Sequence, residues 1–246
     1  IAVWNEEFKN YFDKYIKAKM PEGVTVNFKI TENKDNAYQN KLDEDLPKNE
    51  AASADDKIDM FLFEADYALK YVNSEYTLDV KSLGLTDEDL SGMYQYTKDV
   101  ATTQDGSKVL KGVSWQATPG LYAYRRSIAK DVLGTDDPEK VQEALADWTK
   151  FDEVAAKAAD KGYKMLSGYD DSFRTFSNNV SAPWVNDNKE IIVDDNIMKW
   201  VDQTKTYTDK GYNNKTSLWT DAWAADQGPE GKVFGFFYST WGINFT

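Results

Sequence analysis

The chain has 246 residues, enough for one large domain or two smaller lobes, and 41% of them are hydrophobic. Its formal net charge of −13, from 29 basic and 42 acidic residues, argues against nucleic acid and against an anionic membrane surface as direct ligands. The absence of cysteine and histidine excludes cysteine nucleophiles, Ser-His-Asp triads, zinc sites built from these residues and haem held by histidine.

The first part of the chain alternates strand and helix patterns. Apolar runs and apolar alternation predict strands at 1–4, 24–30, 58–63 and 109–115. Helical spacing predicts helices at 7–19 and 35–46, and Thr86 followed by three acidic residues predicts a helix start. This order of elements is typical of an α/β fold with a mainly parallel sheet.

A proline–glycine pair interrupts the middle of the chain. The stretch 109–115 predicts a strand, Pro119 and Gly120 break the pattern, and 121–124 predicts a second strand. Two strands in line around such a break are able to carry the chain from one lobe to another. A bent strand within a single sheet fits the local pattern equally well.

The second part of the chain continues the alternation. Helical spacing predicts helices at 147–161 and 195–210, and short helices are predicted to start at Asp137 and Phe173. Short strands are predicted at 164–167, 190–193 and 233–238. The inward face of the helix at 147–161 is predicted to carry Trp148, Phe151, Val154, Ala155 and Ala158.

Polar and aromatic residues follow four of the predicted strands. In open α/β sheets, ligands bind beyond the carboxyl ends of the strands, so these positions are candidate ligand residues. Carboxylates and amides suit the hydroxyl groups of a sugar, while a flat aromatic ring packs against the apolar C–H face of a pyranose. The candidates are Trp4, Asn5, Glu6, Glu64, Asp66, Tyr169, Asp170, Tyr238 and Trp241. Arg174 adds a guanidinium group able to hold a carboxylate or phosphate through two hydrogen bonds.

Two other interpretations of the acidic residues remain open. Each acid, taken alone, is also explained as a helix N-cap or as a solvated loop residue. Alternatively, a pair of carboxylates would suit a glycoside hydrolase, whose two acids stand at a fixed separation that a sequence does not give. The acids that could form such a pair are Glu6, Glu64, Asp66 and Asp170.

Four stretches carry a resemblance to a known family. They are Asp59-Met-Phe-Leu-Phe-Glu-Ala-Asp-Tyr67, Leu121-Tyr-Ala-Tyr-Arg-Arg-Ser-Ile-Ala-Lys-Asp131, Leu145-Ala-Asp-Trp-Thr-Lys-Phe151 and Gly231-Lys-Val-Phe-Gly-Phe-Phe-Tyr-Ser-Thr-Trp241. In this order they resemble the third strand, the strand after the crossover, a helix start and the stretch before the sugar-stacking tryptophan. The family is that of the extracellular solute-binding proteins of ABC importers, the class that includes maltose-binding protein.

The resemblance implies a two-lobe, periplasmic-binding-protein-like (type II) α/β fold with mixed, mainly parallel sheets flanked by helices. It implies a first lobe at 1–114, a crossover hinge at 115–120 and a second lobe at 121–246. Because family members are usually longer, the chain is expected to be incomplete at both ends. The ligand would lie in the cleft between the lobes, with Trp241 stacking on a sugar and with Asp66 and Glu64 bonded to its hydroxyl groups. Gln116 falls near the hinge, where the family often has an acid, and joins the candidate residues.

The resemblance also implies a function. The protein is expected to bind a carbohydrate and to deliver it to the membrane permease subunits of an ABC importer, without catalysis, cofactor or metal. It is expected to be a monomer in a bacterium, extracellular and lipid-anchored at the cell surface, or periplasmic. A carbohydrate-active enzyme that uses two of the acids is the alternative, and it would differ by converting its sugar.

Overall fold

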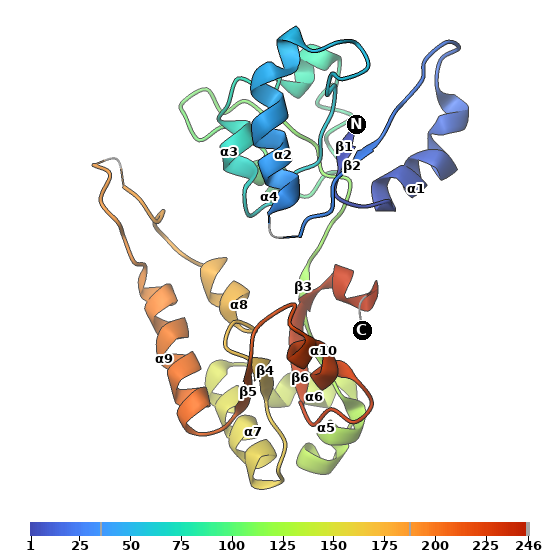
Figure 1. Cartoon of the computed structure of the whole chain (residues 1–246). Coiled ribbons are helices and arrows are strands. Elements are labelled where there is room, and N and C mark those ends of the chain that lie inside the picture. The colour runs from blue at the N-terminus through green and yellow to red at the C-terminus, as the bar shows by residue number, and fades with distance from the viewer. Residues whose placement is uncertain (35, 187, 245–246) are drawn as a thin grey trace. The chain divides into compact units, whose positions relative to one another are not determined.

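The computed structural model describes residues 1–34, 36–186 and 188–244. The chain forms two compact units, Ile1–Ala117 and Thr118–Thr246, which are described separately here (Figure 1). Residue 35, where the second predicted helix begins, and the last two residues of the second predicted lobe lie outside the described residues. Each unit mixes short strands with helices, which confirms the expected α/β class.

The first unit is built on a small parallel sheet. Strand β1 (Ala2–Val3) pairs in parallel with β2 (Lys29–Ile30), and Ala2 also bridges to Phe61 in the parallel sense. Because the pairing is parallel, the residues after β1 and those after Phe61 lie at the same edge of the sheet. The helices are α1 (Glu7–Tyr15), η1 (Lys17–Lys19), α2 (Ala37–Asp45), η2 (Leu46–Ala51), α3 (Ala68–Val72), η3 (Val80–Leu83) and α4 (Gln95–Val100).

All four predicted strands of the first unit are shorter than expected, and 1–4 contributes only β1. The stretch 24–30 contributes only β2, 58–63 contributes only the bridge at Phe61, and 109–115 contributes only an antiparallel bridge at Leu110. Apolar alternation marks a stretch that suits a strand, but a ladder forms only where a second backbone lies alongside. For Leu110 that backbone is the nearby segment around Thr102, so the pairing stays local.

The buried core of the first unit gathers around Tyr38. Its hydroxyl oxygen lies 2.8 Å from the Leu62 carbonyl oxygen and 3.0 Å from the Ala2 carbonyl oxygen. A buried hydroxyl needs such partners, and burial raises the pKa of Tyr38. The Tyr38 side chain therefore ties α2 to two neighbouring strand segments. The buried cluster comprises Ala2, Tyr38, Leu42, Leu46, Ile58 and Tyr71.

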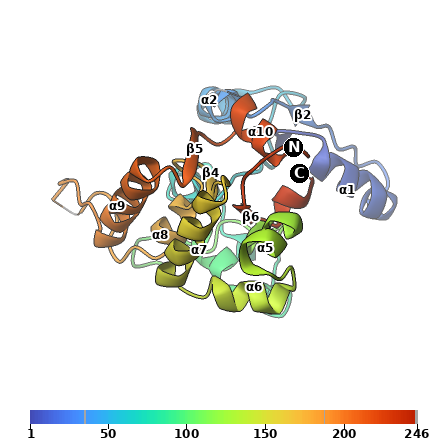
Figure 2. The ribbon, with the colours of Figure 1, turned by 90° about the horizontal axis from the view of Figure 1, so that it is seen from below.

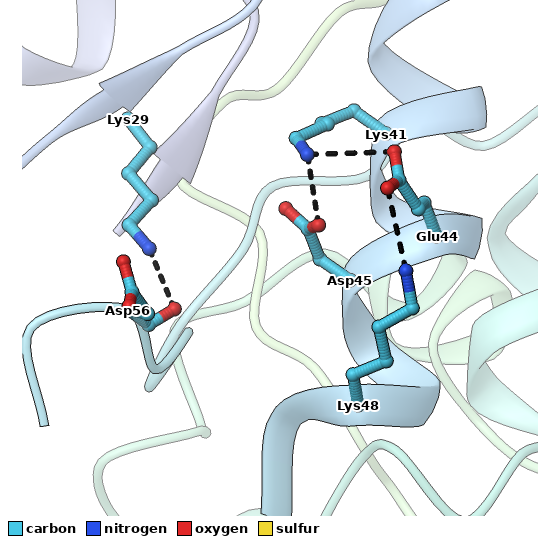
Figure 3. Close-up of polar contacts among 6 residues, drawn as sticks. All are labelled: Lys29, Lys41, Glu44, Asp45, Lys48 and Asp56. Carbon is cyan, nitrogen blue, oxygen red and sulfur yellow. Dashed lines mark hydrogen bonds and ion pairs between the residues drawn. The ribbon is translucent and has the colours of Figure 1, made fainter. Parts of the chain in front are cut away.

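Charged side chains cover the outer face of α2 (Figure 3). Lys41 pairs with Asp45 at 2.9 Å and with Glu44 at 3.5 Å, and Lys48 pairs with Glu44 at 3.3 Å. Exposed pairs of this kind contribute little to stability, because water and salt screen them. Figure 3 also shows Lys29 on β2. Its ammonium group donates to the Asp56 backbone carbonyl oxygen at 2.6 Å. These contacts account for the charges of this face without a ligand.

Helix α1 carries aromatic side chains, yet none of its residues is fully buried. The Phe8 ring lies edge-on to Trp115 with centroids 5.2 Å apart, and Tyr11 lies 5.9 Å from the same indole. Phe12 packs against Phe28 at 5.4 Å. Ring contacts on one side of the helix therefore hold the last residues of the first unit in place.

The second unit contains two strand pairs that a single bridge joins. Strand β4 (Leu166–Gly168) pairs in parallel with β5 (Asn213–Thr216), and β3 (Gly120–Tyr124) pairs antiparallel with β6 (Gly235–Ser239). A parallel bridge from Lys164 to Val233 connects the pairs, so β4, β5 and β6 run in the same direction. The helices are α5 (Arg126–Leu133), α6 (Pro138–Ala144), α7 (Trp148–Asp160), α8 (Phe173–Ser177), α9 (Asp195–Asp209), α10 (Asp221–Gln227) and η4 (Thr240–Asn244).

One sequence-based prediction for the second unit is wrong, and one strand of this unit is not predicted. Residues 190–193 form no named strand, and Ile191 makes only an isolated antiparallel bridge to Val185. Strand β5, in contrast, is present although no pattern predicts it. Its buried residues, Asn213 and Thr216, are polar, so the strand has no apolar alternation.

The core of the second unit lies where α5, α6 and α7 meet the strands, and these helices lie side by side (Figure 2). The Tyr122 ring stands 4.8 Å from Phe237 and 5.3 Å from Phe151, and its hydroxyl donates to the Met165 carbonyl at 3.0 Å. Four of the five residues predicted to face inward on α7 are buried, and Trp148 is half-buried. The amphipathic prediction for this helix is confirmed.

Candidate functional site

Three strands of the second unit end at one edge. Because β4, β5 and β6 run in the same direction, the residues that follow them meet there. The Asp170 carboxylate after β4 accepts the Leu218 N–H after β5 at 3.1 Å. The Trp219 ring after β5 lies 5.1 Å from the Trp241 ring after β6. We call Tyr169, Asp170, Leu218, Trp219 and Trp241 the carboxyl edge of the second unit.

Three predicted ligand residues, Tyr169, Asp170 and Trp241, lie at this edge. Tyr169 is exposed, and its N–H donates to the Thr216 carbonyl at 3.1 Å. Trp241 is half-buried and packs against Tyr238 with ring centroids 5.6 Å apart. The edge thus combines a carboxylate with aromatic rings of differing exposure.

The structure places two further predicted residues elsewhere. Tyr238 is buried, and its hydroxyl donates to the Gln227 side chain, so its ring belongs to the core beneath the carboxyl edge. Burial also raises the pKa of Tyr238. Arg174 is exposed on α8, with its guanidinium carbon 5.8 Å from the centre of the Phe173 ring.

Asp171 is a buried carboxylate that sequence patterns do not distinguish from Asp170. Only 5% of the residue is exposed, and its Oδ2 accepts the N–H groups of Ser167 at 2.8 Å and Gly168 at 2.9 Å. Burial raises the pKa of Asp171 to about 6, while these hydrogen bonds act in the opposite direction. At Gly168, a Cβ would lie 2.6 Å from the Thr216 carbonyl oxygen, so β4 and β5 approach closely there. Asp171 therefore fixes the turn that carries Asp170.

Replacing Asp171 by asparagine is expected to remove a pH dependence of stability. In the unfolded chain this carboxyl group ionises near the ordinary aspartate pKa of 3.8, whereas the folded protein keeps the proton up to a pKa of about 6. Its contribution to the free energy of unfolding is therefore greatest below the unfolded pKa and falls by about 3 kcal/mol as the pH rises through the folded pKa. The melting temperature of the variant minus that of the wild type should rise between about pH 4 and pH 7.

Asp194→Asn is the matched control, because it should give the opposite sign. The Asp194 carboxylate accepts the Asn196 N–H at 2.8 Å at the start of α9, and this bond lowers the pKa of Asp194. A lowered pKa gives a contribution that is present above the unfolded value and is lost as the pH falls. The difference for Asp194→Asn should therefore become more negative as the pH rises. If the difference in melting temperature for Asp171→Asn does not change with pH, the pKa of Asp171 is not raised by burial.

The predicted ligand residues of the first unit follow β1 and the segment that bridges to it. They are Trp4, Asn5, Glu6, Glu64 and Asp66. The Asn5 side chain accepts the Glu7 N–H at 2.9 Å at the start of α1. Trp4 is half-buried with its ring 5.6 Å from Tyr38, whereas the three acids are exposed.

Gln116 lies in the first unit, beside α1. Its side-chain amide donates to the Glu7 carboxylate at 3.0 Å. Because Trp115 also packs on this helix, two consecutive residues fix the end of the first unit to α1. Gln116 therefore has a polar partner within its own unit.

Trp219 belongs to the carboxyl edge although it is not among the predicted ligand residues. It lies between β5 and α10 and is 64% exposed. The Leu218-Trp219-Thr220-Asp221 stretch has the same polar and aromatic signature as the other strand ends. Candidate residues are expected after predicted strands, and because β5 is not predicted, the stretch that follows it is not considered.

In a chain without histidine or cysteine, acidic side chains are the main charged ligands for a cation. Within residues 1–34, 36–186 and 188–244, no group of three or more is arranged to do so. Near the carboxyl edge, Asp170 and Asp171 instead accept backbone N–H groups. Across the same part of the chain, no helix is long and apolar enough to cross a membrane.

Comparisons with known proteins relate the chain to solute-binding proteins. A family model described as bacterial extracellular solute-binding protein matches residues 10–246. No curated protein matches the chain. An extracellular solute-binding protein of family 1 is similar in structure, with a TM-score of 0.78 at 18% identity over 99% of this chain and 60% of that one. The galacto-N-biose/lacto-N-biose I-binding protein of the ABC transporter from Bifidobacterium longum, in complex with lacto-N-biose, has a TM-score of 0.64 at 13% identity over 96% of this chain and 55% of that one.

These findings settle the fold and the family. Both structures confirm the mixed α/β fold of solute-binding proteins that the resemblance implies. The chain spans 60% and 55% of their lengths. Since the family model covers residues 10–246, the chain belongs to the family of bacterial extracellular solute-binding proteins.

Proposed function

We propose that this protein binds a sugar or an oligosaccharide and delivers it to a membrane ABC importer. The observation that carries the proposal is the carboxyl edge of the second unit, where the loop held by Asp170 presents Trp219 next to Trp241. Indole faces suit the apolar C–H side of a sugar ring. The family supports the proposal, and so does the similar protein that was solved with lacto-N-biose.

The carboxylate of Asp170 has room for a second partner. Its two oxygens lie 3.1 and 3.3 Å from the single Leu218 N–H. An ionised carboxylate offers about four acceptor positions, so it can also accept sugar hydroxyl groups. We include the exposed Tyr169 and Arg174 as further polar contacts from the same unit.

The first unit supplies the remaining proposed ligand residues. Glu6, Glu64 and Asp66 are exposed acids that follow parallel strand segments and suit hydroxyl donors. Trp4 offers a half-buried ring at the same place. Asn5 and Gln116 already bond to α1, so a ligand role for them requires that these bonds be shared or exchanged.

The proposed partners follow from delivery to an importer. The protein would present its loaded form to the permease subunits as a monomer. The family is one of bacterial extracellular proteins, which supports a place outside the cytoplasmic membrane. Within that setting we propose either a lipid anchor at the cell surface or a periplasmic location.

Binding without catalysis is part of the proposal. Glycoside hydrolysis requires two carboxyl groups about 5–10 Å apart, one of which donates a proton to the leaving group. Near the carboxyl edge, Asp170 accepts a backbone N–H and Asp171 is buried beneath it, holding two backbone N–H groups. Both carboxylates therefore stabilise the local backbone. No observation favours the glycoside hydrolase alternative.

A thermal-shift screen tests the proposal. The panel comprises glucose, galactose, N-acetylglucosamine, maltose, maltotriose and lacto-N-biose. A ligand that binds only the folded protein stabilises it by about 2.7 kcal/mol at one hundred times its dissociation constant. At least one sugar should therefore raise the melting temperature with a saturating dose response. Amino acids serve as the control panel. If no sugar raises the melting temperature, the proposed function is wrong.

A further inference from the structure

Trp219 is held in a backbone conformation that residues other than glycine rarely adopt. Its φ of +69° lies in the left-handed region, where the side chain crowds its own backbone. Such a conformation persists only where the surroundings enforce it. Here the residues on either side do so. The Leu218 N–H donates to Asp170 at 3.1 Å, and the Thr220 hydroxyl oxygen accepts the Trp223 N–H at 3.3 Å.

The Trp219 ring is the outermost of three tryptophans in contact. Its centroid lies 5.5 Å from Trp223 and 5.1 Å from Trp241. Trp223 is buried, Trp241 is half-buried and Trp219 is 64% exposed. Burial of so large an apolar ring would be favourable, so an orientation that keeps it at the surface suggests a binding role. The two rings beneath it fix that orientation before any ligand arrives.

A pocket lies beside the exposed ring. Its volume is about 220 Å³, and its lining residues are Trp219, Thr220, Asp221, Trp223, Ala224 and Gln227. Pockets that enclose a whole drug-sized ligand measure roughly 300–1,000 Å³, so this one suits part of a larger ligand. Indole rings beside the Asp221 carboxylate are the chemistry that a sugar unit needs. None of the predicted ligand residues lines this pocket.

We propose that Trp219 and this pocket form a second sugar subsite, next to the one at Asp170 and Trp241. The inference rests on the proposed function and deepens it, because two subsites select a disaccharide or a longer oligosaccharide over a monosaccharide. Trp219 stacks on the second sugar ring. Asp170 acts also as a positioning residue, since its carboxylate holds the loop through the Leu218 N–H.

Calorimetric titration of the protein and of single variants tests this inference. The probes are lacto-N-biose, maltose and maltotriose, with galactose, N-acetylglucosamine and glucose as their single units. Trp219→Ala should weaken binding of the longer sugars roughly 5- to 150-fold, as expected for a lost stacking ring, and should change monosaccharide binding less than about twofold. Trp219→Phe retains a ring and should recover most of the affinity.

Trp184→Ala is the matched control. Trp184 is also an exposed tryptophan of the second unit, at 51%, but it lies on the connection between α8 and α9. Its removal should change no sugar affinity. Melting curves recorded by circular dichroism show whether each variant is folded.

The outcomes separate the inference from the function on which it rests. If folded Trp219→Ala binds the longer sugars within about twofold of the wild type, the second subsite is wrong while sugar binding stands. An equal loss for single and longer sugars also overturns it, because Trp219 would then belong to the first subsite. If the wild type binds none of the six sugars, the proposed function fails and the inference fails with it.

Discussion

Replacing Trp241 by alanine is expected to weaken carbohydrate binding roughly 5- to 150-fold, which corresponds to the loss of about 1–3 kcal/mol for one stacking ring. Trp241 follows β6 at the carboxyl edge and is half-buried, in contact with Trp219 and Tyr238. Because its ring is not enclosed by the core, the variant should remain folded. Titration calorimetry with the best sugar of the screen measures the loss.

Trp148→Ala is the control for this prediction. Trp148 lies on α7, stacked on Phe176 with ring centroids 4.9 Å apart and planes 14° from parallel. Since the residue is half-buried, its loss should cost about 2–3 kcal/mol of stability, below the about 3–5 kcal/mol of a fully buried ring. Its sugar affinity should stay unchanged. Equal losses of affinity in both folded variants would contradict the assignment of Trp241.

Replacing Phe234 by alanine is expected to lower the free energy of unfolding by about 3–5 kcal/mol. Phe234 is fully buried, with its ring 6.5 Å from Tyr122, and its N–H donates to the Lys164 carbonyl at 2.7 Å. Its carbonyl accepts the Arg125 N–H, also at 2.7 Å. The side chain therefore fills the core at the place where the two strand pairs of the second unit are joined. Urea denaturation of the variant measures the change.

Ile191→Ala provides the comparison for Phe234→Ala. Ile191 is 78% exposed, so its truncation should change stability by less than about 0.5 kcal/mol. A loss below about 1 kcal/mol for Phe234→Ala would show that the core of the second unit is not closed around this ring. The account of how β4 and β6 are joined would then need revision.

Sequence patterns predict which candidate residues lie close together better than they predict the strands. Tyr169, Asp170 and Trp241 meet at one edge because each follows an apolar run, and such runs survive as strands or bridges. Strand lengths are overestimated in the first unit, where 58–63 keeps a single bridge. Apolar alternation reflects one segment alone, whereas a ladder also requires a partner that only the fold supplies.

Strand β5 shows what apolar periodicity cannot detect. Its buried residues are Asn213 and Thr216, and their polar groups are satisfied by hydrogen bonds inside the unit. Burial of polar groups with partners costs little, so a strand can lie in the interior without an apolar pattern. Missing β5 also meant missing Trp219, the most exposed ring of the carboxyl edge.

Neighbouring residues of like type also divide in ways that a sequence does not reveal. Asp170 and Asp171 are adjacent acids, yet the first is half-buried at the carboxyl edge and the second is buried beneath it. Likewise Asn5 and Glu6 both follow β1, but only Asn5 accepts a helix N–H through its side chain. Burial and capping depend on where the turn directs each side chain, which is fixed by contacts distant in the chain.

The most direct test of carbohydrate binding without turnover is one titration followed by analysis of the recovered ligand. The protein is titrated with the oligosaccharide that raises its melting temperature most, held at saturation for a day, and the sugar is then separated by chromatography. The account predicts saturable binding of one oligosaccharide per chain and full recovery of the intact sugar. Steady appearance of shorter products, or the absence of saturable binding to any sugar of the panel, would contradict it.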